Sequence, residues 1–337
     1  MRARQVPAGS VEAWSMGEDV GMKPVILDVD TGLDDACALL LAARHPELDL
    51  RAVTCVGGNV GLDEVVVNTL TVLEAAGRSD VPVARGAALP LLQPVRAAPH
   101  VHGIDGLGNL DWPRSTRTTD SRHAVELLRD VLLEAARSGD RVTLIPLAPM
   151  TNIALLLRTY PEAAAGLAEI VFMGGAAGIG NATASAEFNI WTDPEAAAIV
   201  LAAAGELGVP VTMYGLDVFY DVLITLDEAR ELKGSPSADL ARALIEKRSE
   251  LYRADGASIG DGGAVCAVID PAGLTTQAFP LRVELSGSWS RGRTIVDTRD
   301  WSKDLSSDPH GAAPTVVQVA TAVDARRYAD LWLQTVS

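Results

Sequence analysis

The sequence predicts an α/β fold, built on an open and mostly parallel sheet that helices cover on both faces. Short runs rich in Val, Ile and Leu alternate with longer stretches whose apolar residues recur at helical spacing. This alternation is typical of a parallel sheet. The composition agrees with a well-filled core, because 48% of the 337 residues are hydrophobic.

The expected elements follow one another regularly along the chain. The expected strands are 25–28, 50–56, 81–84, 142–148, 169–173 and 209–215. The expected helices are 34–44, 62–76, 121–137, 151–159 and 194–205. Several of these helices open with Asp, Ser, Thr or Asp-Pro. After about residue 217 the pattern is mostly helical to 268, and β-like segments follow at 281–285, 294–297 and 315–320.

The domain organisation is expected to be simple. No linker or repeat interrupts residues 23–337, which we expect to form one domain behind a flexible N-terminal extension, residues 1–22. The Gly- and Pro-rich stretch 86–114 is too long for a simple connection. Long loops in compact domains are often lids or binding loops.

The composition argues against several classes of partner. A formal net charge of −16 repels nucleic-acid phosphates and acidic membranes, and no basic stripe interleaved with aromatic residues offsets it. No run reaches the roughly 18 apolar residues of a membrane span, and the N-terminal extension lacks the apolar stretch of a signal peptide. The three cysteines have no C-x-x-C spacing, which indicates reduced core thiols. These features predict a cytoplasmic protein with a small, neutral or metal-held ligand.

The most informative segment is residues 25–36, which places four carboxylates between an apolar strand and an apolar helix. They belong to Asp28, Asp30, Asp34 and Asp35. Anions this close repel one another, and a helix N-terminus or a bound cation must offset their charge. Helix capping would account for one or two of them. Because calcium and magnesium prefer oxygen ligands, and open sheets bind ligands at the carboxyl ends of their strands, the segment predicts a divalent metal site.

Further polar residues follow the other predicted strands. They are Asn59 after the second strand, residues 147–152 after the fourth, Asn181 after the fifth and Asp261 before an apolar helix at 264–269. Glu187 and Asn189 alternate with Phe188 and Ile190, which favours an extended segment that aims both polar side chains one way. Singly, Asn59 or Asp261 is more often a turn or cap residue. Together these residues outline a polyol site around a metal.

The ordered motifs resemble those of the nucleoside hydrolases that prefer inosine and uridine, and the resemblance spans most of the chain. The segments that carry it are Asp28-Val29-Asp30-Thr31-Gly32-Leu33-Asp34-Asp35, Gly58-Asn59, His102-Gly103-Ile104-Asp105-Gly106-Leu107, Pro149-Met150-Thr151-Asn152, Met173-Gly174-Gly175, Glu187-Phe188-Asn189 and Asp193-Pro194-Glu195-Ala196. The resemblance implies a Rossmann-like fold with a strand-end active site. It also implies a homodimer or homotetramer that hydrolyses the N-glycosidic bond of a ribonucleoside to free base and ribose, with bound Ca²⁺.

The resemblance further implies a role for individual residues. The implied metal ligands are Asp30, Asp35, the backbone carbonyl of Leu147 and Asp261. Calcium takes six to eight oxygens, so positions remain for a water and two ribose hydroxyls. Asp30 is expected to take the proton of the attacking water, and Asp28 to orient the turn. The implied substrate-binding set is Asp34, Asn59, Met173, Asn181, Glu187, Phe188 and Asn189. In this set Glu187 and Asn181 lie nearest the 5′-hydroxyl, and Asp34 nearest the 2′-hydroxyl.

One position departs from the family pattern. Members usually carry a His immediately before the last metal-binding Asp, where it can assist departure of the base, and this sequence has Gly260. Another group must then help the base to leave. The candidates are His102, His100, segment 250–258 with Tyr252 and Arg253, and Trp191. His102 is the preferred base contact and the second expected catalytic residue. The departure leaves the choice between purine, pyrimidine and modified bases open.

Two other functions compete with nucleoside hydrolysis. A D-x-D phosphatase would use Asp28 as nucleophile and Asp30 as acid or base, and would cleave phosphate esters with magnesium. A non-catalytic protein that binds metal and ribonucleoside, inactive because the usual His is missing, would bind nucleosides without releasing base.

Overall fold

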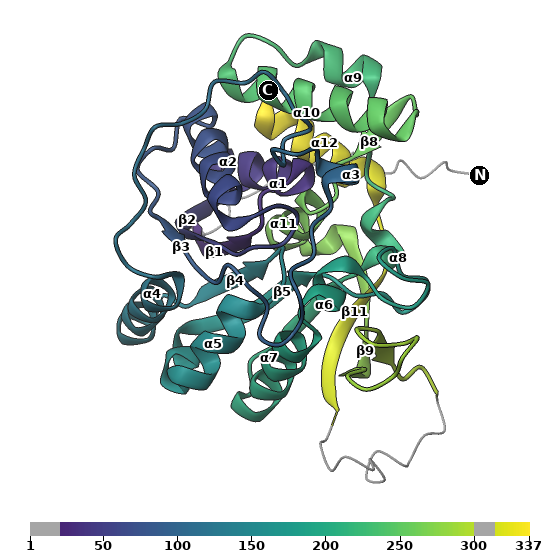
Figure 1. The fold of residues 1–337 in the computed structure, drawn as a ribbon. Coiled ribbons are helices and arrows are strands. Elements are labelled where there is room, and N and C mark those ends of the chain that lie inside the picture. Colours follow the sequence, from purple (N-terminus) through teal and green to yellow (C-terminus); the bar gives the residue numbers. More distant parts are fainter. Residues whose placement is uncertain (1–20, 300–313) are drawn as a thin grey trace, which may run out of the picture.

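A nine-stranded sheet forms the centre of the computed structural model, which describes residues 21–299 and 314–337 (Figure 1). Its strands are β1 (Lys23–Val29), β2 (Leu48–Cys55), β3 (Val83–Arg85), β4 (Val142–Pro146), β5 (Leu167–Met173), β6 (Val211–Tyr214), β9 (Leu274–Val283), β10 (Thr294–Val296) and β11 (Thr315–Val323). Their order is β10-β9-β11-β6-β5-β4-β1-β2-β3. Among the described strands of this sheet, the antiparallel pairs are those of β9 with β10 and β11, so the expected mostly parallel sheet is confirmed.

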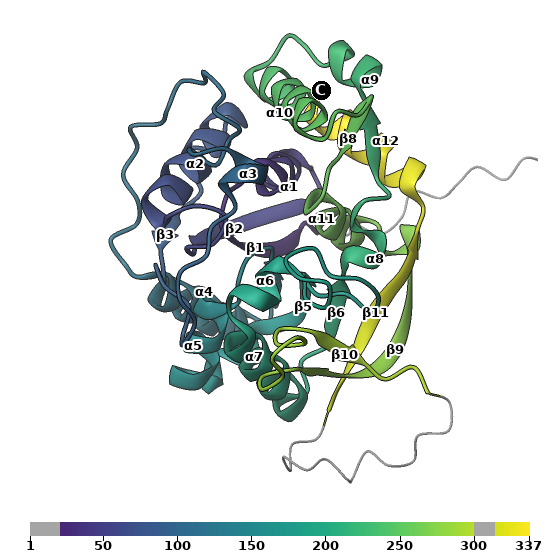
Figure 2. The ribbon, with the colours of Figure 1, turned by 45° about the vertical axis from the view of Figure 1, so that its right-hand side comes forward.

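Helices cover both faces of this sheet, as expected (Figures 1 and 2). The longer ones are α1 (Leu33–Arg44), α2 (Leu62–Ala75), α4 (Ala124–Ser138), α5 (Thr151–Thr159), α7 (Pro194–Leu207), α10 (Pro236–Tyr252), α11 (Gly262–Ile269) and α12 (Ala325–Val336). Short helices are α3 (Pro99–His102), α6 (Phe188–Thr192), α8 (Leu216–Phe219) and α9 (Leu226–Glu231), with 3₁₀ turns at Pro161–Gly166 and Pro271–Gly273. Among the described helices, none is both long and apolar enough to cross a membrane.

The central strand β1 is buried on both faces and separates two hydrophobic cores. Val25, Leu27 and Val29 belong to the core formed with α1, α2, α10, α11 and α12. Ile26 points to the opposite core, formed with α4, α5 and α7. This alternation follows from the two-residue period of a strand. It explains why β1 appears in the sequence as a continuous apolar run.

The strand order changes direction at β1, which places the acidic turn in a crevice. The chain passes from β1 to β2 and β3 on one side of the sheet, and from β4 to β5 and β6 on the other. The loops that follow β1 and β4 therefore diverge at their carboxyl ends. Open α/β sheets bind ligands at such a switch point. Asp30 and Leu147 lie there, each within two residues of its strand end.

Three local expectations differ from the structure. Segment 217–268, expected to be mostly helical, also contains a two-stranded antiparallel sheet of β7 (Leu223–Thr225) and β8 (Gly256–Ser258). Three-residue strands are too short to show a period of two. Helix α12 was not expected. The segment around Glu187–Ile190, expected to be extended, is instead the start of α6.

Two further expectations concern the chain ends and the cysteines. The N-terminal extension, residues 1–22, lies outside the described residues except for its last two, and its flexibility stays a prediction. The single domain of residues 23–337 likewise stays a prediction. Cys37, Cys55 and Cys266 are free and buried, as expected of core thiols.

Candidate active site

The turn from β1 into α1 is built by hydrogen bonds to the side chain of Asp35. Its Oδ1 accepts from the backbone N–H of Asp30 at 3.2 Å, and its Oδ2 accepts from that of Gly32 at 2.9 Å. The carboxylates of Asp34 and Asp35 lie in the first turn of α1, where the helix dipole favours negative charge. Capping therefore explains part of the acidic run, but the dipole is too weak to neutralise several buried anions.

Asp30 is fixed by the loop after β2. Its Oδ2 accepts from the backbone N–H of Asn59 at 2.7 Å, and its Oδ1 accepts from Asn59 Nδ2 at 3.0 Å. Gly58 permits this approach, since a Cβ added there would collide with the Asp30 carboxylate. Burial and repulsion from Asp35 raise the pKa of Asp30 well above its usual value. This shift belongs to the site without a metal ion, because a bound cation would favour the charged carboxylate.

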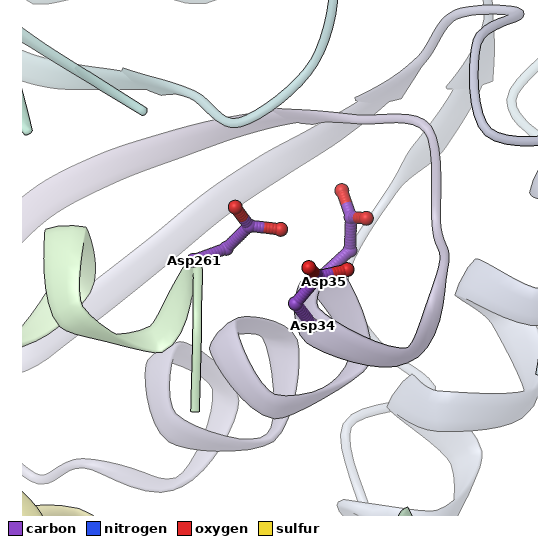
Figure 3. A group of neighbouring side chains, drawn as sticks. All are labelled: Asp34, Asp35 and Asp261. Atoms are coloured by element: carbon purple, nitrogen blue, oxygen red, sulfur yellow. The ribbon is translucent and has the colours of Figure 1, made fainter. Parts of the chain in front are cut away.

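Asp34, Asp35 and Asp261 bring carboxylate oxygens within 4.8 Å of one another (Figure 3). Asp34 and Asp35 come from α1, and Asp261 comes from the segment directly before α11. Burial, and then the charges of its acidic neighbours, raise the pKa of Asp261 well above its usual value. Burial and the charge of Asp34 raise the pKa of Asp35 to about 7. Asp34 pairs with Arg248, but Asp35 and Asp261 have no ion-pair partner among the described residues. A bound divalent metal ion would relieve this situation.

The donor set of this cluster fits a hard cation. Asp30, Asp35 and Asp261 offer carboxylate oxygens, which calcium and magnesium prefer. Leu147 lines the cavity beside the cluster, and its carbonyl accepts from Asn189 Nδ2 at 2.9 Å and retains a second lone pair. Asp34, expected to bind ribose, also belongs to the cluster.

A cavity of about 570 Å³ opens above the acidic cluster. The expected site residues on its wall are Asp34, Asn59, His102, Leu147, Met173, Asn181, Glu187, Phe188, Asn189 and Asp261. Asp30 and Asp35 do not line it and are fully buried. Segments far apart in the sequence thus meet around one cavity. Its volume is in the range of small-molecule sites.

Glu187 caps helix α6 and thereby places the polar residues around it. Its carboxylate accepts from the backbone N–H groups of Asn189 at 2.8 Å, Ile190 at 3.1 Å and Gly175 at 2.9 Å. Burial raises the pKa of Glu187 to about 7, against the opposing effect of these N–H groups. Asn181 Oδ1 accepts from the N–H of Phe188 at 2.9 Å. Helix capping, and not an extended segment, therefore brings Glu187 and Asn189 to the same wall.

His102 lies against the acidic turn and keeps one ring nitrogen for another partner. Its Nδ1 accepts from the backbone N–H of Leu33 at 3.2 Å, so the neutral ring carries its proton on Nε2. Burial lowers the pKa of His102 despite the attraction of Asp34. A Cβ at Gly32 would collide with the imidazole, so the glycine of the turn makes room for it.

The structure explains why a side chain is excluded at position 260. Gly260 has φ +56°, and an added Cβ would lie 2.7 Å from Asp34 Cβ and 2.8 Å from Phe219 Cζ. The Phe219 ring stands beside this position, where the family resemblance leads us to expect His, and Phe219 also lines the cavity. A histidine there would need Phe219 to move.

Sequence reasoning missed several residues around the cavity. Arg96, Phe219 and Tyr220 line it, and buried Arg248 pairs with Asp34 behind it. The Arg96 guanidinium lies 3.6 Å from the centroid of the Trp191 ring, and its Nη1 donates to the Trp191 carbonyl at 2.7 Å. This contact holds the long loop against α6. The only sequence signal was the length of stretch 86–114, which flagged a binding loop but not Arg96.

Asp28 is fully buried and does not line the cavity. Its Oδ1 accepts from Thr54 Oγ1 at 2.5 Å and from Asn152 Nδ2 at 2.8 Å. These contacts fit the expected role of orienting the turn. The D-x-D phosphatase alternative needs Asp28 at the substrate, and Asp28, like Asp30, does not line the cavity.

Replacing Asp28 with Asn is expected to remove a pH dependence of stability. Burial raises the pKa of Asp28 to about 7, whereas the unfolded side chain titrates near 4. Between these values only the unfolded chain has lost the proton, so rising pH favours unfolding by about 1.4 kcal/mol per pH unit. The unfolding free energy of Asp28→Asn minus that of wild type should rise by about 3 kcal/mol from pH 4.5 to 7. Urea denaturation of both proteins in chelator tests this.

The control for that measurement is Asp63→Asn, since the side chain of Asp63 is 88% exposed. Its difference from wild type should stay constant over the same pH range. A constant difference for Asp28→Asn as well would contradict the assigned shift.

Comparisons with known proteins agree with this site. Residues 25–330 match the family model described as inosine-uridine preferring nucleoside hydrolase. The chain is 39% identical over 287 residues to the inosine-uridine preferring nucleoside hydrolase of Leishmania major, covering 82% of this chain and 88% of that protein. It is 38% identical over 281 residues to the pyrimidine-specific ribonucleoside hydrolase of Escherichia coli O8 (strain IAI1), covering 81% and 88%.

A solved structure of a plant nucleoside hydrolase agrees with the whole fold. It superposes with a TM-score of 0.83 at 32% identity, covering 93% of this chain and 98% of that chain. The family match, the two relatives and this structure all point to one class of enzyme. The chain belongs to the inosine-uridine preferring nucleoside hydrolase family, whose members hydrolyse the N-glycosidic bond of nucleosides.

Proposed function

We propose that this protein is a calcium-dependent ribonucleoside hydrolase, with Asp30, Asp35, Asp261 and the Leu147 carbonyl as metal ligands. The observation that carries the proposal is the buried acidic cluster beside a cavity lined by amide and carboxylate side chains. Among the described residues, Asp35 and Asp261 of this cluster have no ion-pair partner, whereas Asp34 pairs with Arg248. Calcium suits this donor set because it accepts irregular sets of oxygen ligands. When bound, the ion supplies Lewis-acid chemistry that makes a water molecule easier to deprotonate.

Asp30 is the proposed general base. It takes one proton from the water whose oxygen forms a bond to the anomeric carbon of the ribose. The bond from that carbon to the base nitrogen breaks, its electron pair stays on the base, and the base takes up a proton from solvent. Asn59 holds both oxygens of the Asp30 carboxylate and so fixes its direction. General bases of this kind contribute about 10²–10⁴-fold to the rate.

Negative charge around the sugar favours the transition state. Breaking a glycosidic bond develops oxocarbenium character on the ribose, whereas the substrate is neutral. Asp34 and Glu187 lie on the wall of the cavity, and the carbonyl dipole of Leu147 joins them. These groups therefore stabilise the transition state more than the bound nucleoside. Asp34, Asn59, Met173, Asn181, Glu187, Phe188 and Asn189 form the proposed substrate-binding set.

His102 is the proposed partner of the leaving base, in place of the missing histidine. Its Nε2–H is the free donor, because Nδ1 is occupied by the Leu33 N–H. The lowered pKa keeps the ring neutral at pH 7, so His102 donates a hydrogen bond to the departing base and does not need to be charged. The aromatic wall of Phe188, Trp191 and Phe219 offers stacking surface to a base.

Product analysis tests the proposed reaction. The calcium-loaded protein, incubated with ribonucleosides in phosphate buffer, should release base and free ribose in equal amounts, as measured by chromatography and a reducing-sugar assay. If the sugar product is ribose 1-phosphate, the reaction is phosphorolysis and the proposed hydrolysis is wrong. Binding without any product would support the non-catalytic alternative.

A further inference from the structure

Arg248 is a buried cation that the reaction described above does not use. It lies on α10, its side chain is 3% exposed, and it does not line the cavity. Its Nη1 lies 3.0 Å from Oδ2 of Asp34. The ion pair reaches from α10 to the first turn of α1, so it joins two helices of the same core.

The pair carries polar atoms that find no hydrogen-bond partner within the protein. Nε and Nη1 of Arg248 and Oδ1 of Asp34 are all buried without one, although Nη1 lies at ion-pair distance from Asp34 Oδ2. Unsatisfied buried groups are costly. The stability of the ion pair therefore depends on the position of the Asp34 carboxylate and on whether a ligand satisfies its free oxygen.

Asp34 is confined on its other sides as well. The Nδ1 atom of His102 lies 3.7 Å from Asp34 Oδ1, and Gly260 leaves no room for a Cβ between Asp34 and Phe219. Arg248 always carries a positive charge, whereas the His102 ring is neutral when its Nδ1 accepts from Leu33. Of these two neighbours, Arg248 is therefore the cation that Asp34 faces. The direction of the carboxylate is therefore set mainly by Arg248.

We propose that Arg248 is a positioning residue, which holds the Asp34 carboxylate toward the ribose 2′-hydroxyl and so sets the selectivity for ribonucleosides over 2′-deoxyribonucleosides. The proposal rests on the proposed function, and the family resemblance implies that the ribose 2′-hydroxyl lies nearest Asp34. A carboxylate held in this direction accepts a hydrogen bond from the 2′-hydroxyl and so strengthens binding of the ribonucleoside. When the hydroxyl is missing, the buried carboxylate stays unpaired and binding of the deoxyribonucleoside is weakened. Without Arg248, the Asp34 carboxylate is expected to turn away from the 2′-hydroxyl. Both the gain in ribonucleoside binding and the loss in deoxyribonucleoside binding then become smaller.

The test compares Arg248→Met with Arg242→Met, a control on the same helix whose side chain is 33% exposed and pairs with Asp239. The measured quantity is kcat/KM for the best ribonucleoside divided by kcat/KM for its 2′-deoxy form. Arg248→Met should lower this ratio about 10- to 100-fold, the worth of one charged hydrogen bond, mainly through the ribonucleoside. Arg248→Lys, which keeps the charge, should recover part of the ratio, and the control should leave it unchanged.

A purely structural role would lower both kcat/KM values by the same factor, and that result would overturn the proposal. An unchanged ratio in folded Arg248→Met would overturn it too. Since removing one partner of a buried ion pair can prevent folding, the double variant Arg248→Met/Asp34→Asn provides a second test. In the Asp34→Asn background, Arg248→Met should change the ratio no further. A further fall there would mean that Arg248 does not act through Asp34.

The wild-type assay separates this proposal from the proposed function. If wild type releases no base from any ribonucleoside, hydrolysis is wrong for this chain, and calorimetry with inosine and 2′-deoxyinosine then replaces the rates. Arg248→Met should still lose affinity for inosine and keep its affinity for 2′-deoxyinosine. Equal losses for both would reject the role of Arg248 independently of catalysis.

Discussion

Asp30→Asn is expected to lower kcat by about 10²–10⁴-fold while ribose still binds. The substitution removes the proton acceptor but keeps the shape of the side chain and one acceptor oxygen for Asn59. A carboxylate can take up a proton from an attacking water, whereas an amide cannot. Single-turnover rates at saturating calcium measure the loss, and calorimetric titration with ribose measures binding.

Asp63→Asn is the matched control for this variant, because it makes the same chemical change at an exposed position. Asp30 is also a proposed metal ligand, so the calcium content of Asp30→Asn must be measured alongside the rate. Full calcium occupancy with unimpaired turnover would remove Asp30 from the role of general base.

Asp261→Ala is expected to lower the metal content of the purified protein. Elemental analysis should find about one calcium per wild-type chain after dialysis and much less in the variant, since one of four proposed protein ligands is lost. Asp255→Ala, an exposed aspartate shortly before it in the chain, is the control and should retain the metal. Equal calcium in all three proteins would contradict the ligand set.

A second prediction for position 261 is that the order of thermal stability of wild type and Asp261→Asn reverses between chelator and calcium. In chelator, Asp261→Asn should unfold at a higher temperature than wild type, because the variant lacks one of the carboxylates that repel one another in the buried cluster. With calcium at 100 times its dissociation constant, wild type gains about 2.7 kcal/mol and the order should reverse. Thermal unfolding in the two buffers would show this reversal. The same order in both buffers would mean that the cluster is not a metal site.

The parts of the site that depend on local sequence could be predicted. The continuous apolar run of β1 and the acidic start of α1 predicted the strand, the turn and the helix. The predicted strand ends placed Asp30, Leu147 and Asn59 at one edge of the sheet. Parallel strands end at the same edge of a sheet, so this inference needs no knowledge of packing.

The rest depends on contacts between distant segments. Glu187 was expected in an extended segment because alternation of two polar residues does not distinguish a strand from a capped helix start. Arg248 looks in the sequence like a charge on an amphipathic helix, and only the packing of α10 against α1 shows that it is buried beside Asp34. The exclusion of a side chain at Gly260 likewise depends on Phe219, some forty residues away in the chain.

Base release from ribonucleosides and their 2′-deoxy forms is the most direct test of the central claim. Calcium-loaded wild-type protein would be incubated with inosine, adenosine, guanosine, uridine, cytidine and the deoxy counterparts, and free base followed by chromatography. The acidic, hydroxyl-binding cavity predicts release from at least one ribonucleoside and much slower release from its deoxy form. Release from none, with nucleoside binding still detected by calorimetry, would contradict hydrolysis and leave a binding protein.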